Sequence, residues 1–141
     1  MPKEKWIELI KSLDPSCKIY LLGSASDHAL CEEIRSTNAQ CINLAGQLSF
    51  MQSAALVKSA EMNFVNDSAP LHIASAMNAP VRAFFCSTIP EFGFGPLSDN
   101  KKVIQIEEKL YCRPCGLHGY KTCPEGHFKC ALNINVKNAL L

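Results

Sequence analysis

The chain has 141 residues, of which 48% are hydrophobic and 19% charged, and its formal net charge is +1. This length suits one domain with a single core, and the composition excludes a disordered chain. The balanced charge provides no basic face for nucleic acid, and no apolar run is long enough to span a bilayer, so we expect a soluble cytoplasmic protein without a nucleic-acid partner.

Helical and extended patterns alternate along the chain. Trp6, Leu9, Ile10 and Leu13 follow helical spacing and predict a first helix that stops at Asp14-Pro15. We predict strands at 18–22, 41–44, 62–66, 81–85 and 103–106, with helices after the first three and a last helix at 134–141. This alternation predicts an α/β fold, a Rossmann-like parallel sheet with helices on both faces.

Three polar turns follow predicted strands, at 23–27, 66–68 and 86–88. Ligands of an open parallel sheet bind beyond the carboxyl ends of its strands, so these turns are candidate binding segments. The chain has neither a Gly-x-Gly-x-x-Gly nor a Gly-x-x-x-x-Gly-Lys-Ser/Thr motif, which argues against a dinucleotide oxidoreductase and a P-loop phosphotransferase. Ser24 and Asp27 also fit the simpler interpretation of helix-capping residues.

The most informative stretch is 62–77, where a buried strand turns into a helix. Asp67 or Ser68 can cap that helix, and Pro70 is tolerated in its first turn. Free N–H groups at such a helix start attract phosphate, and His72 can add a donor. The alternative is that Asp67 and Ser68 only cap the helix and that His72 is an ordinary partly buried imidazole.

Four of the eight cysteines are scattered through apolar segments, which is typical of buried thiols in a reducing compartment. The other four, Cys112, Cys115, Cys123 and Cys130, lie in a Cys-rich segment, residues 112–130, with C-x2-C-x7-C-x6-C spacing. Structural zinc, disulfides and reduced thiols all fit this spacing, and His118 and His127 are substitute donors.

Several motifs resemble glycosyltransferase family nine, the bacterial heptosyltransferases of lipopolysaccharide core assembly. They are Asn43-Leu44-Ala45-Gly46, Val65-Asn66-Asp67-Ser68-Ala69-Pro70-Leu71-His72-Ile73-Ala74, and Phe85-Cys86-Ser87-Thr88 with Gly95-Pro96 downstream. The resemblance implies that residues 1–141 are a single donor-binding domain, the C-terminal half of a GT-B enzyme. It also implies an ADP-heptose-type donor, a lipopolysaccharide core acceptor and no cofactor required for transfer.

The resemblance assigns expected roles to individual residues. Asp67 is expected to contact sugar hydroxyls of the donor, the amides of Ser68 and Ala69 to hold the diphosphate, and His72 to support it. Asp27 is expected near the nucleoside. Ser87 and Thr88 match a less sharply defined part of the same pocket. Many relatives have Gly in place of Ala69 and Cys86, where a Cβ can crowd a phosphate.

By the same resemblance, residues 1–141 lack the first strand of the half domain, the acceptor-binding half and the family's proposed catalytic carboxylate. We therefore expect the isolated chain to be inactive, with a gap in its sheet that favours a dimer or higher oligomer. The complete enzyme is expected at the inner face of the bacterial inner membrane. The alternatives are a non-catalytic nucleotide-binding module and a zinc-stabilised interaction module.

Overall fold

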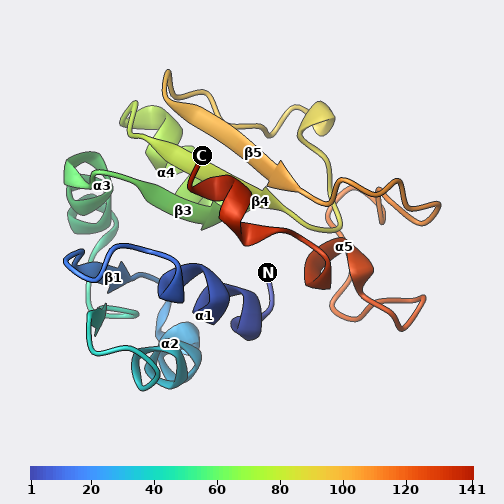
Figure 1. The fold of residues 1–141 in the computed structure, drawn as a ribbon. Helices are drawn as coiled ribbons and strands as arrows, with labels where there is room; N and C mark the ends of the chain where they lie inside the picture. Colours follow the sequence, from blue (N-terminus) through green and yellow to red (C-terminus); the bar gives the residue numbers. More distant parts are fainter.

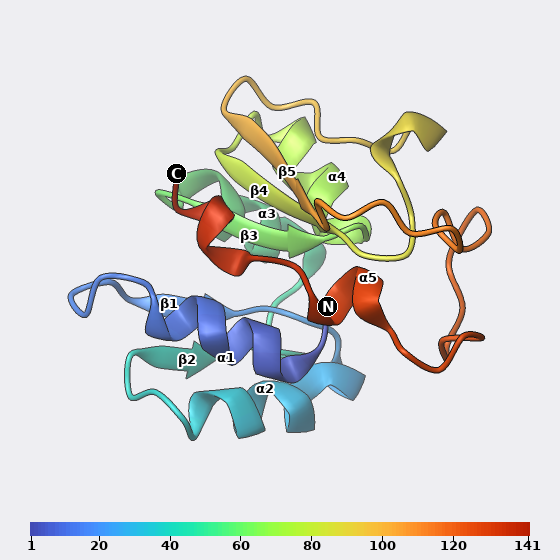
Figure 2. The same cartoon turned by 45° about the vertical axis from the view of Figure 1, so that its right-hand side comes forward.

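All 141 residues are described by the computed structural model, in which helices alternate with short parallel strands (Figures 1 and 2). The strands are β1 (Ile19–Leu21), β2 (Cys41–Asn43), β3 (Asn63–Asn66), β4 (Val81–Phe85) and β5 (Lys101–Gln105). The helices are α1 (Lys3–Lys11), α2 (His28–Arg35), α3 (Phe50–Ser59), α4 (Ala69–Ala76) and α5 (Lys129–Leu132), with 3-10 turns at Ala25–Asp27, Pro90–Phe92 and Val136–Ala139. None of the helices is long and apolar enough to cross a membrane.

β4 separates the two largest parts of the hydrophobic core. Val81, Ala83 and Phe85 belong to a cluster with buried residues of α3 and α4, whereas Phe84 packs with Leu9 of α1 and with residues of β5 and the C-terminus. Successive side chains of a strand point to opposite faces, so this alternation shows that helical segments cover both faces of the sheet. The predicted α/β fold with helices on both faces is confirmed.

The strands form two separate parallel sheets, β1-β2 and β3-β4-β5. The N–H of Ile19 bonds to Gln40 next to β2, and the N–H of Asn63 bonds to Pro80 next to β4. Backbone groups of a parallel strand alternate between its two sides, so Tyr20 and Phe64 direct theirs away from those partners. β1 and β3 therefore each keep an edge without a strand, which agrees with the gap expected from the sequence.

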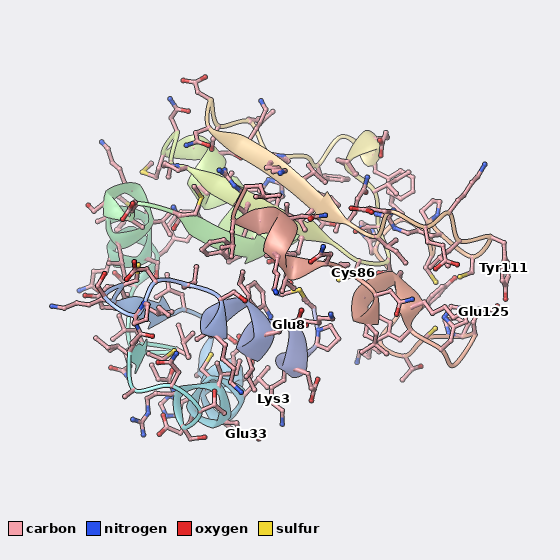
Figure 3. All side chains as sticks on the ribbon, in the orientation of Figure 1. Lys3, Glu8, Glu33, Cys86, Tyr111 and Glu125 are labelled. Atoms are coloured by element: carbon pink, nitrogen blue, oxygen red, sulfur yellow. The ribbon has the colours of Figure 1, made fainter.

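Helix α1 connects the two sheets from one face. The ring of its Trp6 lies edge-on to Phe84 of β4, with centroids 5.4 Å apart and planes at 74°. Ile10, on the same helix, packs with Ile34 of α2 and Cys41 of β2. An ion pair of 2.6 Å between Lys3 and Glu33 joins α1 to α2 at the surface (Figure 3). The helix thus replaces part of the cohesion that a continuous sheet would supply.

The C-terminal segment differs from the prediction of one helix over 134–141. An α-helix, α5, forms earlier, and residues 136–139 form only a 3-10 turn. The side chain of Asn135 accepts a hydrogen bond from the Lys137 N–H, 3.2 Å away, which starts a new turn at Asn135. Ile134 and Val136 are fully buried, so the apolar residues that suggest helical periodicity here instead anchor this turn in the core.

Truncation of Leu71 tests the core between α4 and β4. Leu71 has no exposed surface, and Leu71→Ala is expected to lower the free energy of unfolding by about 2–5 kcal/mol because it leaves a cavity. Leu97, 78% exposed, is the matched control, and Leu97→Ala is expected to change stability by less than about 0.5 kcal/mol. Chemical denaturation measures both, and equal effects of the two substitutions would contradict this description of the core.

Candidate functional site

The three polar turns singled out from the sequence all follow carboxyl ends of strands. Residues 23–27 follow β1, residues 67–68 follow β3 and residues 86–88 follow β4. The arrowheads of β1, β3 and β5 point the same way in Figure 1. The turns therefore lie on the side of the molecule where open parallel sheets bind their ligands.

The turn between β3 and α4 presents the start of a helix to solvent. Ser68 has an extended backbone (φ −166°), α4 begins at Ala69, and Pro70 occupies its first turn. Ser68, Ala69 and His72 are exposed. No side chain caps this helix, so the capping expected of Asp67 or Ser68 is wrong. Its first N–H groups stay available to an anion.

Asp67 bonds to a different partner instead. The Thr88 hydroxyl donates a hydrogen bond of 2.6 Å to the Asp67 carboxylate, and a hydroxyl–carboxylate bond of this length is strong. Asp67 is half-buried, whereas Thr88 is only 6% exposed. Thr88 therefore holds Asp67 from inside the protein, while direct contact of either residue with a donor stays a prediction.

Residues 86–88 are covered by the Cys-rich segment. The Cys115 N–H donates to the Ser87 carbonyl over 2.8 Å. Gly119 lies so close to Ser87 that a Cβ at position 119 would stand 2.5 Å from its hydroxyl oxygen. The half-buried Arg113 donates to the carbonyls on both sides of Ser87. Sequence reasoning missed Arg113, because its partners are mainly backbone oxygens that no side-chain pattern reveals.

Asp27 lies in a separate turn and serves as a local cap. Its carboxylate accepts hydrogen bonds from the Ser24 N–H (2.8 Å) and the Ser24 hydroxyl (2.6 Å). The hydroxyl bond, followed by the backbone bond, lowers the pKa of Asp27 below its ordinary value. A Cβ at Gly23 would stand 2.8 Å from that of Asp27, so this close approach requires glycine. These bonds agree with the capping interpretation, and a nucleoside contact stays a prediction.

His72, the expected additional donor, projects from the first turns of α4. Its ring lies edge-on to Phe94, with centroids 6.3 Å apart and planes at 72°. The contact turns the imidazole toward the loop 89–97 and leaves it exposed. His72 therefore lies in the first turns of α4 with an exposed ring, and its support of a phosphate stays a prediction.

The Cys-rich segment does not form a ready metal site. All eight cysteines are free, and no group of three or more potential ligands is arranged to hold a metal ion. Cys112 Sγ lies 3.9 Å from His127 Nε2, and His127 Nδ1 accepts from the Lys129 N–H over 3.1 Å. That second bond leaves the proton of a neutral imidazole on Nε2, the atom facing Cys112. The present arrangement does not fit a zinc ion, and structural zinc stays a prediction from spacing.

Burial makes the thiols of Cys115 and Cys130 weaker acids than a free cysteine. Desolvation, followed by the nearby Cys112 and Cys123, raises the pKa of Cys115. Desolvation is also the main cause of the raised pKa of Cys130.

Hydrogen bonds hold the Cys-rich segment in place. Next to Cys112, the Tyr111 hydroxyl donates to Glu125 (Figure 3). The segment is therefore folded by hydrogen bonds among its own side chains and against residues 86–88.

The domain is Rossmann-like. It has parallel strands, helices on both faces, and the exposed start of α4 at the carboxyl end of β3. Residues 1–126 match glycosyltransferase family 9 (heptosyltransferase), so the chain belongs to this family. The matched range includes every expected donor-site residue and Cys112, Cys115 and Cys123, but it ends before Cys130.

Two similar proteins support membership in this family and show which share of their length this chain covers. Lipopolysaccharide heptosyltransferase 2 of Escherichia coli K12 is 34% identical in an alignment 111 positions long that covers 74% of this chain and 32% of the relative. Lipooligosaccharide heptosyltransferase 2 of Haemophilus influenzae is 35% identical in an alignment 95 positions long that covers 64% of this chain and 27% of the relative. This chain thus spans about a third of the length of the relatives it matches.

A solved structure shows the same fold. The structure of the E. coli ADP-heptose lipopolysaccharide heptosyltransferase II superposes with a TM-score of 0.69 at 31% identity. The superposition covers 81% of this chain and 38% of that one. The expected resemblance to a heptosyltransferase is therefore confirmed in both sequence and structure.

Ser24→Ala tests the capping bond of Asp27. Because the hydroxyl bond is the largest cause of the lowered pKa, its loss is expected to raise the pKa of Asp27 toward the ordinary value. A carboxyl with a lowered folded-state pKa stabilises the fold above its unfolded-state pKa, and this stability is lost as pH falls through the folded-state pKa. Ser24→Ala is therefore expected to reduce stability above about pH 4 and not in stronger acid.

Carbon-detected NMR titration of the Asp27 carboxyl measures this shift. Ser26→Ala is the control, because the Ser26 hydroxyl contacts that of Ser24 (2.7 Å) and not Asp27. An equal pKa rise in both variants would contradict the assignment of the bond to Ser24.

Metal analysis of freshly purified protein tests the zinc prediction. If the four cysteines of the segment 112–130 rearrange around zinc, about one equivalent is expected per chain. Cys112→Ser would then lose the metal, whereas Cys17→Ser, outside the segment, would keep it. Metal-free protein with four reactive thiols in the segment would exclude structural zinc.

Proposed function

We propose that this chain is the nucleotide-sugar-binding half of a lipopolysaccharide heptosyltransferase-like enzyme. In the complete enzyme it grips an ADP-heptose-type donor while the sugar is transferred to a lipopolysaccharide core acceptor. The observation that carries the proposal is the uncapped start of α4, beside the Asp67–Thr88 pair, in a member of glycosyltransferase family 9.

The chemistry of the corner fits this function. As the acceptor hydroxyl attacks the anomeric carbon, the nucleoside diphosphate leaves and its negative charge grows. The N–H groups of Ser68 and Ala69, at the positive end of the α4 dipole, stabilise that charge without reorganising. Asp67, fixed by Thr88, is oriented to accept hydrogen bonds from sugar hydroxyls. Ser87 and His72 border the same space, and Asp27 is assigned to its nucleoside side.

Transfer requires an acceptor-binding half in addition to residues 1–141. Inverting transfer also needs a base to deprotonate the acceptor hydroxyl, and the resemblance places no base in this chain. The open edges of β1 and β3 are the places where the expected first strand of this half would pair. We therefore propose that the isolated chain binds donor weakly and transfers no sugar. We also propose that the protein is soluble and works in the cytoplasm, at the inner face of the bacterial inner membrane.

Binding of ADP by the isolated chain tests the function directly. Calorimetry is expected to give a Kd of about 0.1–1 mM for ADP, with weaker binding of UDP and GDP. Ala69→Pro removes one N–H at a helix position that tolerates proline, and it is expected to weaken ADP binding about tenfold through the loss of one charged hydrogen bond. Ala69→Gly retains the N–H and is expected to bind at least as well as the parent.

Three results would contradict the proposal. If Ala69→Pro and Ala69→Gly bind ADP equally, the helix amides do not hold the diphosphate. Turnover of a heptose donor by the purified 141-residue chain would contradict the division of labour between two halves. Failure to bind any nucleotide, together with full folding, would favour an interaction module.

A further inference from the structure

Arg113 lies in the Cys-rich segment, yet its side chain reaches the carboxyl ends of two strands. Its Nε donates to the Cys86 carbonyl over 2.8 Å, and its Nη2 donates to the Thr88 carbonyl over 2.8 Å. The same Nη2 lies 2.7 Å from Oε1 of Gln105, the last residue of β5. One guanidinium therefore joins the loop after β4 to the end of β5.

The residue between these two carbonyls is held by the same segment. Ser87 accepts from the Cys115 N–H over 2.8 Å. Three consecutive carbonyls, those of Cys86, Ser87 and Thr88, thus accept hydrogen bonds from Arg113 and Cys115. A loop with every carbonyl bonded in this way has little freedom to move.

The consequence reaches Asp67 through Thr88. The Thr88 backbone is fixed by Arg113, and its hydroxyl donates to the Asp67 carboxylate over 2.6 Å. Thr88 is 6% exposed, so water does not replace this bond easily. If the loop moved away by the length of one hydrogen bond, Asp67 would lose the group that orients it.

We propose that Arg113 is a positioning residue of the donor site, which sets the orientation of Asp67 through the Cys86–Thr88 loop. This inference rests on the proposed donor-binding function. The Nε and Nη2 donors of Arg113 are directed to protein oxygens, so the contribution proposed for them is geometric rather than attraction of the diphosphate. A forked, planar group is needed because the acceptors lie in different directions, which the single ammonium of lysine cannot match.

The inference also gives the Cys-rich segment a place in the site. Arg113 and Cys115 lie in the C-x2-C motif, Arg113 between its two cysteines and Cys115 as the second cysteine. Their bonds to residues 86–88 connect this motif to the proposed donor site around Asp67 and Thr88. The segment is then a support of the binding site and not an independent module.

The test compares the affinities of single and double variants of the full 141-residue chain for ADP-heptose, whose sugar hydroxyls are the proposed partners of Asp67. Arg113→Lys, Arg113→Gln and Thr88→Val are each expected to weaken ADP-heptose binding about tenfold and to leave binding of ADP, which lacks the sugar, close to that of the parent. Because Arg113 acts through Thr88, Arg113→Gln combined with Thr88→Val is expected to show the same loss of about tenfold, and not about a hundredfold. Arg82→Gln is the matched control: Arg82 donates to Asn100 at the opposite end of β4 and is expected to leave affinity unchanged.

These variants distinguish a positioning role from simple attraction of charge. If Arg113→Lys binds ADP-heptose as tightly as the parent chain, a positive charge at position 113 is sufficient, and the proposal is overturned. A hundredfold loss in the double variant would overturn the path through Thr88. Melting curves identify a variant that fails to fold. If Arg113→Gln does not fold, Arg113→Lys, which changes the side chain less, is compared with the parent instead.

A second measurement needs no nucleotide. Exchange of the Cys115 N–H with solvent, followed by NMR, reports whether the loop contact survives. Arg113→Lys and Arg113→Gln are expected to accelerate it at least about tenfold while the core amides of β4 change less. If the parent chain binds no ADP, the proposed function fails, whereas unchanged exchange at Cys115 overturns the positioning role itself.

Discussion

The structure depends on β4, a strand enclosed on both faces. Its alternating side chains belong to two different core clusters, one with α3 and α4 and one with α1 and the C-terminal turn. A strand buried on both faces cannot shift by one residue without exchanging the side chains that fill each cluster. This constraint fixes the place where β4 ends, and with it the loop 86–88. Thr88 therefore stands where its hydroxyl meets Asp67.

The division into two sheets changes what holds the domain together. Between β1 and β3 no backbone ladder exists, so α1 and the side chains around it carry the connection. Side-chain packing is less directional than a ladder of hydrogen bonds. The corner at Asp67 and Thr88, however, is built entirely within β3-β4-β5 and the Cys-rich segment, on the side with the continuous sheet. Its hydrogen bonds therefore do not cross the gap between the two sheets.

The departures from expectation have a common cause. The predicted cap of α4 is absent because Asp67 bonds to Thr88, which lies 21 residues away. The predicted final helix is a short turn because Asn135 begins a new turn and burial of Ile134 decides the path of the chain. In both cases a distant or buried partner competed successfully with a local preference. Where no such partner exists, local chemistry decides the structure, as at the start of α3, where Ser49 and Gln52 exchange hydrogen bonds in a capping box.

The sequence alone determined the order of strands and helices from α1 to β5, the placement of polar turns at carboxyl ends, and the family. These properties follow from hydrophobic periodicity and short motifs, which are local. Only the tertiary structure decided that the sheet is divided, that Thr88 serves Asp67, and that Arg113 joins the Cys-rich segment to the donor corner. Each of these rests on contacts between segments far apart in the chain. The backbone carbonyls that Arg113 uses are common to all residues, so the sequence carries no sign of which ones will be bonded.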